Sequence, residues 1–210
     1  MIRVLIADDH AIVRKGMVQI ASESREIEIR GEAKDYGALM KLMREQECDV
    51  LLLDISMPGK NGIDVLKIVK ETYAKTRVLI LSMYPEDQYA IRALKAGAHG
   101  YLTKDSAPER LVEAILAVSQ GKKYITPSVA EMLATHLTSD TEGEAHEQLS
   151  DREFQTLKLI ASGKQLSQIA EELVLSPKTV SVYRARVLEK LQLRNNADIA
   201  HYAFKHGLME

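Results

Sequence analysis

Five side chains of this sequence have the types needed for metal and phosphoryl chemistry at one site. Asp8 and Asp9 follow the apolar run IRVLIA, and Asp54 follows the run DVLLL. Ser82 and Lys104 lie just beyond two later runs. Clustered carboxylates repel one another unless a cation lies among them, and hard oxygen ligands favour Mg²⁺. One carboxylate could then attack a phosphoryl group, while the metal and the lysine neutralise the transferred oxygens and the serine hydroxyl bonds to the product.

These side chains meet only if the runs before them are parallel strands of one sheet. Apolar runs alternate with stretches of helical periodicity as far as residue 120. The expected strands are 2–7, 27–33, 49–53, 77–81 and 98–102, and the expected helices are about 11–17, 36–46, 62–72, 86–96 and 107–119. Runs 49–53 and 78–81 are apolar on both faces, as buried strands are. We therefore expect an α/β fold with a five-stranded parallel, doubly wound sheet and the candidate residues at its carboxyl edge.

A simpler interpretation exists for each residue taken alone. An acidic residue at the end of a strand is often only a helix cap, and a lone lysine is usually solvated. The joint occurrence, with each group at the end of its own expected strand, favours the functional interpretation.

The regular pattern stops near residue 120. We expect a linker over 121–148, with a short amphipathic helix from Pro127 to Leu137, because 138–148 has almost no apolar side chains. Residues 149–210 show no strand signal and form a small all-α unit of four expected helices. Ser150 and Glu153 have the spacing of a capping box at its start.

Two helices of this last part have a helix-turn-helix pattern. They span 165–173 and 177–191, and Ser176 followed by Pro177 is a strong helix start. The outer face of the second could enter a major groove, with basic side chains reaching phosphates. The candidate DNA contacts are Lys178, Thr179, Ser181, Val182, Arg184, Ala185, Arg186 and Lys190. A helical bundle with merely solvated basic residues is the alternative, because 151–210 has only nine basic residues against seven acidic ones.

Four segments resemble the receiver domain of two-component response regulators. They are VLIADDH (4–10), LLLDISMPGKNG (51–62), VLILSMY (78–84) and AGAHGYLTKD (96–105). The resemblance covers about residues 1–120 and implies a flavodoxin-like fold. It implies that Asp54 accepts the phosphoryl group and that Lys104 pairs with it. It also implies that Asp8, Asp9, Asp54 and the backbone carbonyl of Ser56 hold Mg²⁺.

The resemblance further implies a conformational switch. Ser82 matches the switch hydroxyl, and Tyr101 matches the aromatic residue whose ring turns inward on activation. A permanently packed strand aromatic is the alternative for Tyr101. Pro58 and Gly62 match the turn after the phosphorylated aspartate. Met83 departs from the family, because a small residue is frequent there and a bulky one could restrict access to the phosphoryl group.

Residues 149–203 resemble the LuxR-type helix-turn-helix, and the combination with a receiver is that of the NarL/FixJ class. Thr179 and Val180 match the start of the recognition helix. Ser181 and Tyr183 stand where lysine and histidine are frequent, which would weaken nonspecific affinity or shift base preference. The resemblance implies homodimers on pseudo-palindromic double-stranded DNA. A last helix, about 195–207, offers a pairing face or completes the core through Ala197, Ala200, Ala203 and Phe204.

The leading hypothesis is a transcription regulator whose dimerisation and DNA binding are controlled by a sensor histidine kinase. RNA polymerase is a further candidate partner. The chain would be no enzyme beyond Mg²⁺-dependent phosphorylation and dephosphorylation of itself. A phosphatase or phosphotransferase is one alternative, but the second acid expected two residues after Asp54 is replaced by Ser56. A pure interaction protein is the other, and failure to bind any duplex would favour it.

Composition narrows the class of protein. Hydrophobic residues make up 46% and charged residues 28% of the 210 residues, which is ordinary for a globular protein. No apolar run approaches the roughly 20 residues of a membrane span, and the acidic start of the chain does not suit a secretory signal. The lone Cys48 fits a buried thiol in a reducing cytosol, and the six histidines show no metal-ligand spacing. We therefore expect a cytoplasmic protein.

Overall fold

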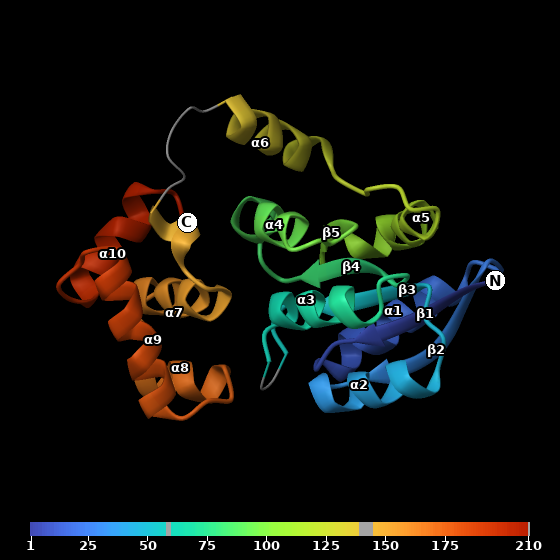
Figure 1. Ribbon diagram of the computed structural model, residues 1–210, viewed down its shortest axis with the longest axis horizontal. Helices are drawn as coiled ribbons and strands as arrows, with labels where there is room; N and C mark the ends of the chain where they lie inside the picture. The colour runs from blue at the N-terminus through green and yellow to red at the C-terminus, as the bar shows by residue number, and fades with distance from the viewer. Residues whose placement is uncertain (58–59, 139–144, 210) are drawn as a thin grey trace. The chain divides into compact units, whose positions relative to one another are not determined.

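The computed structural model describes residues 1–57, 60–138 and 145–209, without the side chains at 87–88 and 136–138. The chain divides into two compact units, Met1–Ser139 and Asp140–Glu210. The first combines strands and helices, and the second is helical (Figure 1). Among the described helices, none has the combination of length and apolarity that a membrane span requires.

The first unit is a parallel sheet between two layers of helices. Its elements are β1 (Ile2–Ala7), α1 (Ala11–Ser22), β2 (Ile27–Ala33), α2 (Tyr36–Glu45), β3 (Val50–Asp54), α3 (Gly62–Thr72), β4 (Arg77–Ser82), α4 (Glu86–Lys95), β5 (Gly100–Thr103), α5 (Ala107–Ser119) and α6 (Pro127–Thr138). Every strand pairing is parallel, in the order β2-β1-β3-β4-β5. Helices α1 and α5 share one core with β1 and β3, and α2, α3 and α4 cover the other face (Figure 1). The expected flavodoxin-like α/β fold is confirmed.

The central strand β3 fixes the position of its last residue, Asp54. All five of its residues are buried. Successive side chains of a strand point to opposite faces, so Leu52 packs in the core with α1 and α5 while Leu51 and Leu53 point to the other face. Burial stabilises each of these leucines by roughly 1.5–3 kcal/mol. The strand end is therefore a rigid place for a reactive carboxylate.

A tight connection follows β3. A Cβ atom on Gly62 would lie 2.2 Å from the carbonyl oxygen of Asp54, so only glycine fits there. The Gly62 amide donates to the Ile55 carbonyl at 2.8 Å, and the Asn61 side chain caps α3 by accepting from the Ile63 amide at 2.8 Å. Pro58, which the resemblance also placed in this turn, lies outside the described residues.

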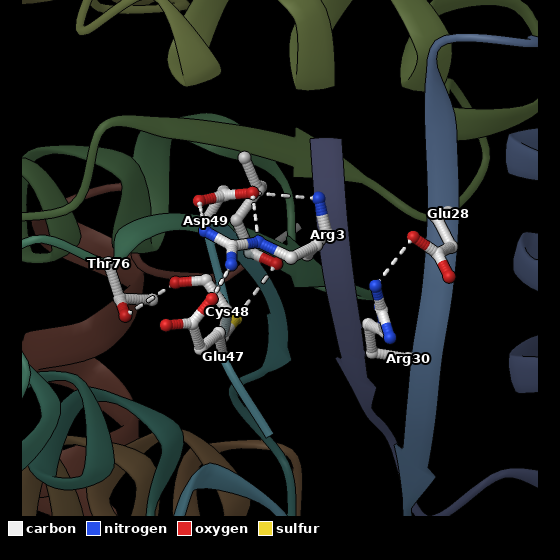
Figure 2. Close-up of polar contacts among 8 residues, drawn as sticks. Arg3, Glu28, Arg30, Glu47, Cys48, Asp49 and Thr76 are labelled. Atoms are coloured by element: carbon white, nitrogen blue, oxygen red, sulfur yellow. Dashed lines mark hydrogen bonds and ion pairs between the residues drawn. The ribbon is translucent and has the colours of Figure 1, made fainter. Parts of the chain in front are cut away.

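The amino edge of the same sheet is closed by paired charges (Figure 2). The Arg3 guanidinium donates to both carboxylate oxygens of Asp49, with Nε to Oδ2 at 2.8 Å and Nη2 to Oδ1 at 2.6 Å. It also pairs with Glu47. The Thr76 hydroxyl donates to the Cys48 carbonyl at 2.9 Å, and the Cys48 thiol donates to the Val50 carbonyl at 3.2 Å. These contacts tie β1 and the start of β4 to the segment that leads into β3.

The segment after α5 belongs to the first unit. Tyr124 forms an isolated parallel bridge with Gly100, and its amide donates to the His99 carbonyl at 2.8 Å. The Thr126 hydroxyl then donates to Glu86 Oε2, at the start of α4, at 2.6 Å. Helix α6 packs on α4 and buries Val129. Residues 139–144, within the expected linker, lie outside the described residues.

The second unit is all-helical, as expected. It consists of the 3₁₀ turn η1 (Ala145–Gln148), α7 (Asp151–Ala161), α8 (Leu166–Glu172), α9 (Pro177–Lys190) and α10 (Asn196–Lys205). The Ser150–Glu153 capping box forms, with the Ser150 amide donating to Glu153 at 2.8 Å. Ser176 caps α9 by accepting from the Thr179 amide at 3.1 Å. The turn between α8 and α9 passes through Val174 at φ 53°, a conformation that a β-branched residue rarely adopts.

Candidate functional site

The sheet brings the expected charged groups together at its carboxyl edge. Asp8 follows β1, Asp54 ends β3, and Lys104 follows β5. The Lys104 ammonium lies 2.8 Å from Asp54 Oδ2 and 2.8 Å from Asp8 Oδ2. Both carboxylate side chains are only 1% exposed, and the lysine side chain is 3% exposed. One cation therefore serves two buried anions.

The carboxylates of the site carry more negative charge than Lys104 alone balances. Burial raises the pKa of Asp54, and Asp8 adds to this, while Lys104 and the Ser56 amide oppose it. Burial by itself would lower the pKa of Lys104, but the attraction of Asp54 and Asp8 outweighs it and holds that pKa above its ordinary value. The Ser56 amide donates to Asp54 Oδ1 at 3.1 Å. A further cation would relieve the remaining repulsion.

The donor set suits such a cation. One ligand atom from each of Asp8, Asp9, His10 and Asp54 lies within 4.8 Å of the others. Asp8 Oδ2 is buried and lies 2.8 Å from the Lys104 ammonium, and Asp9 Oδ1 is buried and accepts no hydrogen bond from the described residues. Carboxylate oxygens are ligands for hard divalent ions. The residues therefore fit an ion such as Mg²⁺.

His10 lies with the aspartates of this site, although no ligand role was expected for it. The six histidines show no ligand spacing along the chain, yet the turn from β1 into α1 carries this one to the two aspartates. Its Nδ1 lies 2.9 Å from Asp9 Oδ1, and its amide donates to Asp8 Oδ1 at 2.7 Å. Its position directly after the acidic pair was the only signal in the sequence.

The hydroxyl groups of Ser82 and Tyr101 both form hydrogen bonds with the backbone of Tyr84, in the loop after β4. Ser82 is fully buried, and its hydroxyl oxygen accepts from the Tyr84 amide at 3.0 Å. The Tyr101 hydroxyl donates to the Tyr84 carbonyl at 2.8 Å, and the ring is 1% exposed. Burial raises the pKa of the Tyr101 phenol, which therefore keeps its proton. The Met83 side chain is 61% exposed, so it points away from the core.

The outer face of α9 carries most of the candidate DNA contacts. The side chains of Val180 and Val187 are buried in the unit. The exposed candidates are Lys178, Ser181, Val182, Ala185, Arg186 and Lys190, and the half-buried ones are Thr179 and Arg184. The exposed residues of the helix therefore include small, apolar and basic side chains.

Two of these basic residues already have partners inside the unit. The Lys190 ammonium lies 2.6 Å from Glu153 Oε2 and donates to the Gln148 carbonyl at 3.3 Å. Burial would raise the pKa of Glu153, but Lys190 and Ser150 outweigh it and lower that pKa. The Arg184 Nε donates to Asn196 Oδ1 at 2.5 Å. Lys190 thus joins the end of α9 to the start of α7, a role that sequence spacing could not reveal.

The four residues of α10 that were expected on a pairing face or in the core differ in exposure. Ala203 is buried in the core of the second unit, while the Phe204 side chain is 76% exposed. Ala197 is exposed and Ala200 is half-buried. Both expectations, core and exposed face, therefore describe part of α10.

Two protein families match the chain. The response regulator receiver domain matches residues 4–116, and the luxR family of bacterial regulatory proteins matches residues 147–203. The response regulator UvrY of Escherichia coli is 35% identical over 209 residues, which is 99% of this chain and 96% of the relative. The response regulator GacA of Pseudomonas aeruginosa is 34% identical over 211 residues, which is 100% of this chain and 99% of the relative.

Solved structures of the response regulator RcsB are also similar. One from Salmonella typhimurium has a TM-score of 0.70 and 28% identity, with 96% of each chain covered. Another, from Salmonella enterica serovar Typhimurium, is bound to the promoter rprA in the presence of the phosphomimetic BeF₃⁻. It has a TM-score of 0.66 and 27% identity, with 96% of this chain and 97% of that chain covered.

Proposed function

Since this chain belongs to the two-component response regulators, with a receiver domain and a LuxR-type DNA-binding domain, we propose that phosphorylation of Asp54 controls its binding to DNA. We assign the receiver to 1–120, the linker to 121–148 and the DNA-binding part to 149–210. The observation that carries the proposal is the position of the buried Asp54 carboxylate. It lies 2.8 Å from Lys104 and belongs to an acidic cluster with Asp8 and Asp9. A sensor histidine kinase is the expected phosphodonor.

The chemistry is a transfer onto an Asp54 oxygen. Its lone pair forms the bond to phosphorus while the bond from phosphorus to the donor breaks, and the electron pair of that bond leaves with the donor. Lys104 stands at 2.8 Å from Oδ2, where it can neutralise the transferred oxygens. Asp8, Asp9, Asp54 and the Ser56 carbonyl would hold Mg²⁺, which supplies further charge neutralisation when bound. The chain would catalyse this step and the hydrolysis of its own phosphoaspartate, and no other reaction.

A switch can start from the hydroxyl of Ser82. Its oxygen accepts from the Tyr84 amide, and its O–H group can donate to a phosphoryl oxygen. A shift of Ser82 moves Tyr84, and the Tyr84 carbonyl is the acceptor of the Tyr101 hydroxyl. The phosphoryl group would favour one arrangement of this loop because it interacts better with it, which is a shift between existing populations.

The output would be binding of α9 to double-stranded DNA. RcsB, a similar protein, has been solved as two dimers on two parallel DNAs, and this supports a homodimer on a pseudo-palindromic site for the present chain. The contacts would come from Lys178, Thr179, Ser181, Val182, Arg184, Ala185, Arg186 and Lys190. RNA polymerase is a further candidate partner, and we place the protein in the cytoplasm.

Two measurements test the proposal. Asp54→Asn should abolish incorporation of radioactive phosphate from acetyl phosphate and Mg²⁺, whereas Asp105→Asn, at an exposed acid beside Lys104, should keep it. Undiminished labelling of Asp54→Asn would sink the assignment. Selection from a random duplex library should enrich a two-fold symmetric motif only with beryllofluoride and Mg²⁺. Equal enrichment without the mimic would remove phosphorylation as the control, and no enrichment would favour a protein-binding output.

A further inference from the structure

The His10 side chain lies beside the carboxylates of Asp8, Asp9 and Asp54 and does not serve as a helix cap. It precedes α1, but its side chain makes no capping hydrogen bond to that helix. Its Nδ1 instead lies 2.9 Å from Asp9 Oδ1 and 3.4 Å from Asp8 Oδ1. The side chain is 56% exposed, so the ring can turn without unpacking the core.

The contact between His10 and Asp9 resembles a pair of ligands more than a hydrogen bond. Asp9 Oδ1 is buried and accepts no hydrogen bond from the described residues, despite the nitrogen at 2.9 Å. Neighbouring ligands of an octahedral divalent ion with bonds near 2.1 Å lie about 3 Å apart. The observed separation of nitrogen and oxygen matches that spacing. Asp54 contributes a further ligand atom within 4.8 Å of both.

We propose that His10 is a nitrogen ligand of the cation held by the aspartate cluster, and that it shifts the preference of the site from Mg²⁺ toward Mn²⁺. This rests on the cation site of the proposed function. Mg²⁺ takes oxygen ligands almost exclusively, whereas imidazole suits transition-metal ions. A site of carboxylates alone would lack this preference. His10 is therefore the residue that sets which divalent ion the receiver prefers.

A different role for His10 would leave a different signature. If the imidazole only donated a hydrogen bond to Asp9, it would orient that carboxylate equally for both ions. The metal would then have oxygen ligands only. Detection of nitrogen bound to the metal separates the two roles, and it does not depend on phosphorylation.

The first experiment uses electron spin echo modulation of Mn²⁺ bound to the full-length protein. We expect ¹⁴N coupling in the wild type, its loss in His10→Ala, and its persistence in His201→Ala, a control at an exposed histidine of α10. Asp9→Asn should abolish Mn²⁺ binding and so locate the ion. Mn²⁺ bound in an Asp9-dependent way without nitrogen coupling would overturn the proposal, as would coupling that survives in His10→Ala.

The second experiment measures the affinities for Mn²⁺ and Mg²⁺ separately. His10→Ala and His10→Asn should weaken Mn²⁺ binding about tenfold and leave Mg²⁺ binding nearly unchanged, and circular dichroism will show that both variants are folded. Equal weakening of both ions would overturn the proposed selectivity. Failure of the wild type to bind either ion would instead overturn the cation site itself, which is a separate result.

Discussion

The two edges of the receiver sheet both carry charge, but they balance it differently. At the carboxyl edge, Asp8 and Asp54 share Lys104, and all three side chains are nearly fully buried. At the amino edge, Arg3 is held by Asp49 and Glu47, and the Arg3 and Asp49 side chains are 32% and 36% exposed (Figure 2). Buried charge is costly when it is unbalanced, whereas exposed pairs cost and contribute little.

This difference in charge balance distinguishes a candidate functional edge from a structural one. The carboxyl edge keeps an excess of negative charge that a cation or a transferring phosphoryl group with its metal can use. At the amino edge, the charge of Arg3 is balanced by Asp49 and Glu47. A cavity of about 500 Å³ nevertheless lies beside this edge. A concave surface alone is therefore a poor guide to function here, and unbalanced buried charge is the better one.

Replacing Lys104 should give the largest change in stability. Lys104→Met leaves Asp8 and Asp54 buried without a counter-ion, so we expect the free energy of unfolding to fall by about 3–5 kcal/mol without divalent ions. Asp54→Asn should cost far less, because Asp8 still pairs with the lysine. Urea unfolding of the first unit, followed by circular dichroism, measures both. Equal losses in the two variants would contradict the shared-cation picture.

At the amino edge, Cys48 should be almost inert. Burial raises the pKa of its thiol to about 12, and the thiol donates to the Val50 carbonyl. The thiolate is the reactive form, and a rise of that size from the ordinary 9.0 leaves about a thousandfold less of it at neutral pH. Labelling by a disulfide reagent should be slower by about that factor in the native protein than in urea. Rapid native labelling would show that this edge is open.

His99 should make the stability of the amino edge depend on pH. Burial lowers its pKa to about 4, helped by Lys70, Lys123 and Arg77. The unfolded chain therefore takes up a proton between pH 6.5 and 4 that the folded chain excludes. Stability is full above pH 6.5 and falls by about 3 kcal/mol as the pH drops through this window.

The matched variant for this prediction is His99→Gln. Its amide oxygen can still accept from the Val78 amide, as His99 Nδ1 does at 3.3 Å. Urea unfolding at pH 7, 6, 5 and 4 should give a steeper loss for the wild type than for the variant. Parallel curves would mean that carboxylates alone produce the acid sensitivity.

The strands were predictable from the sequence because a doubly covered parallel sheet buries both faces of its central strands. Each therefore appears as an unbroken apolar run, and its polar successor marks the carboxyl edge. That rule placed Asp8 and Asp54 at one edge, and the alternation of strands and helices added Lys104 after the outer strand β5, although their chemical roles remain predictions. Helix α1 was expected over about 11–17 and extends to Ser22, and Ala21, one turn after Met17, continues its buried face.

Contacts between side chains that are far apart in the sequence could not be predicted from the hydrophobic pattern. The pairing of Lys190 with Glu153 joins residues 37 positions apart, and the approach of His10 to Asp9 depends on how the chain leaves β1. The packing of α6 on α4 combines the burial of Val129 with a hydrogen bond from Thr126 to Glu86, residues 40 positions apart. These contacts follow from three-dimensional geometry, which periodicity does not encode.

The smallest effect is expected at the Arg3–Asp49 pair, and it is the sharpest test of the difference between the edges. Hydrogen bonds from the Arg3 side chain lower the pKa of Asp49, so its stabilisation is present above the ordinary value of 3.8 and is lost as the pH falls below it. Asp49→Asn should lower the unfolding midpoint by less than Lys104→Met does, and the loss should shrink in 1 M NaCl because exposed pairs are screened. The Lys104→Met loss should persist in salt, since screening does not reach buried charges. A salt-insensitive Asp49→Asn loss as large as that of Lys104→Met would show that the two edges are held by the same kind of interaction.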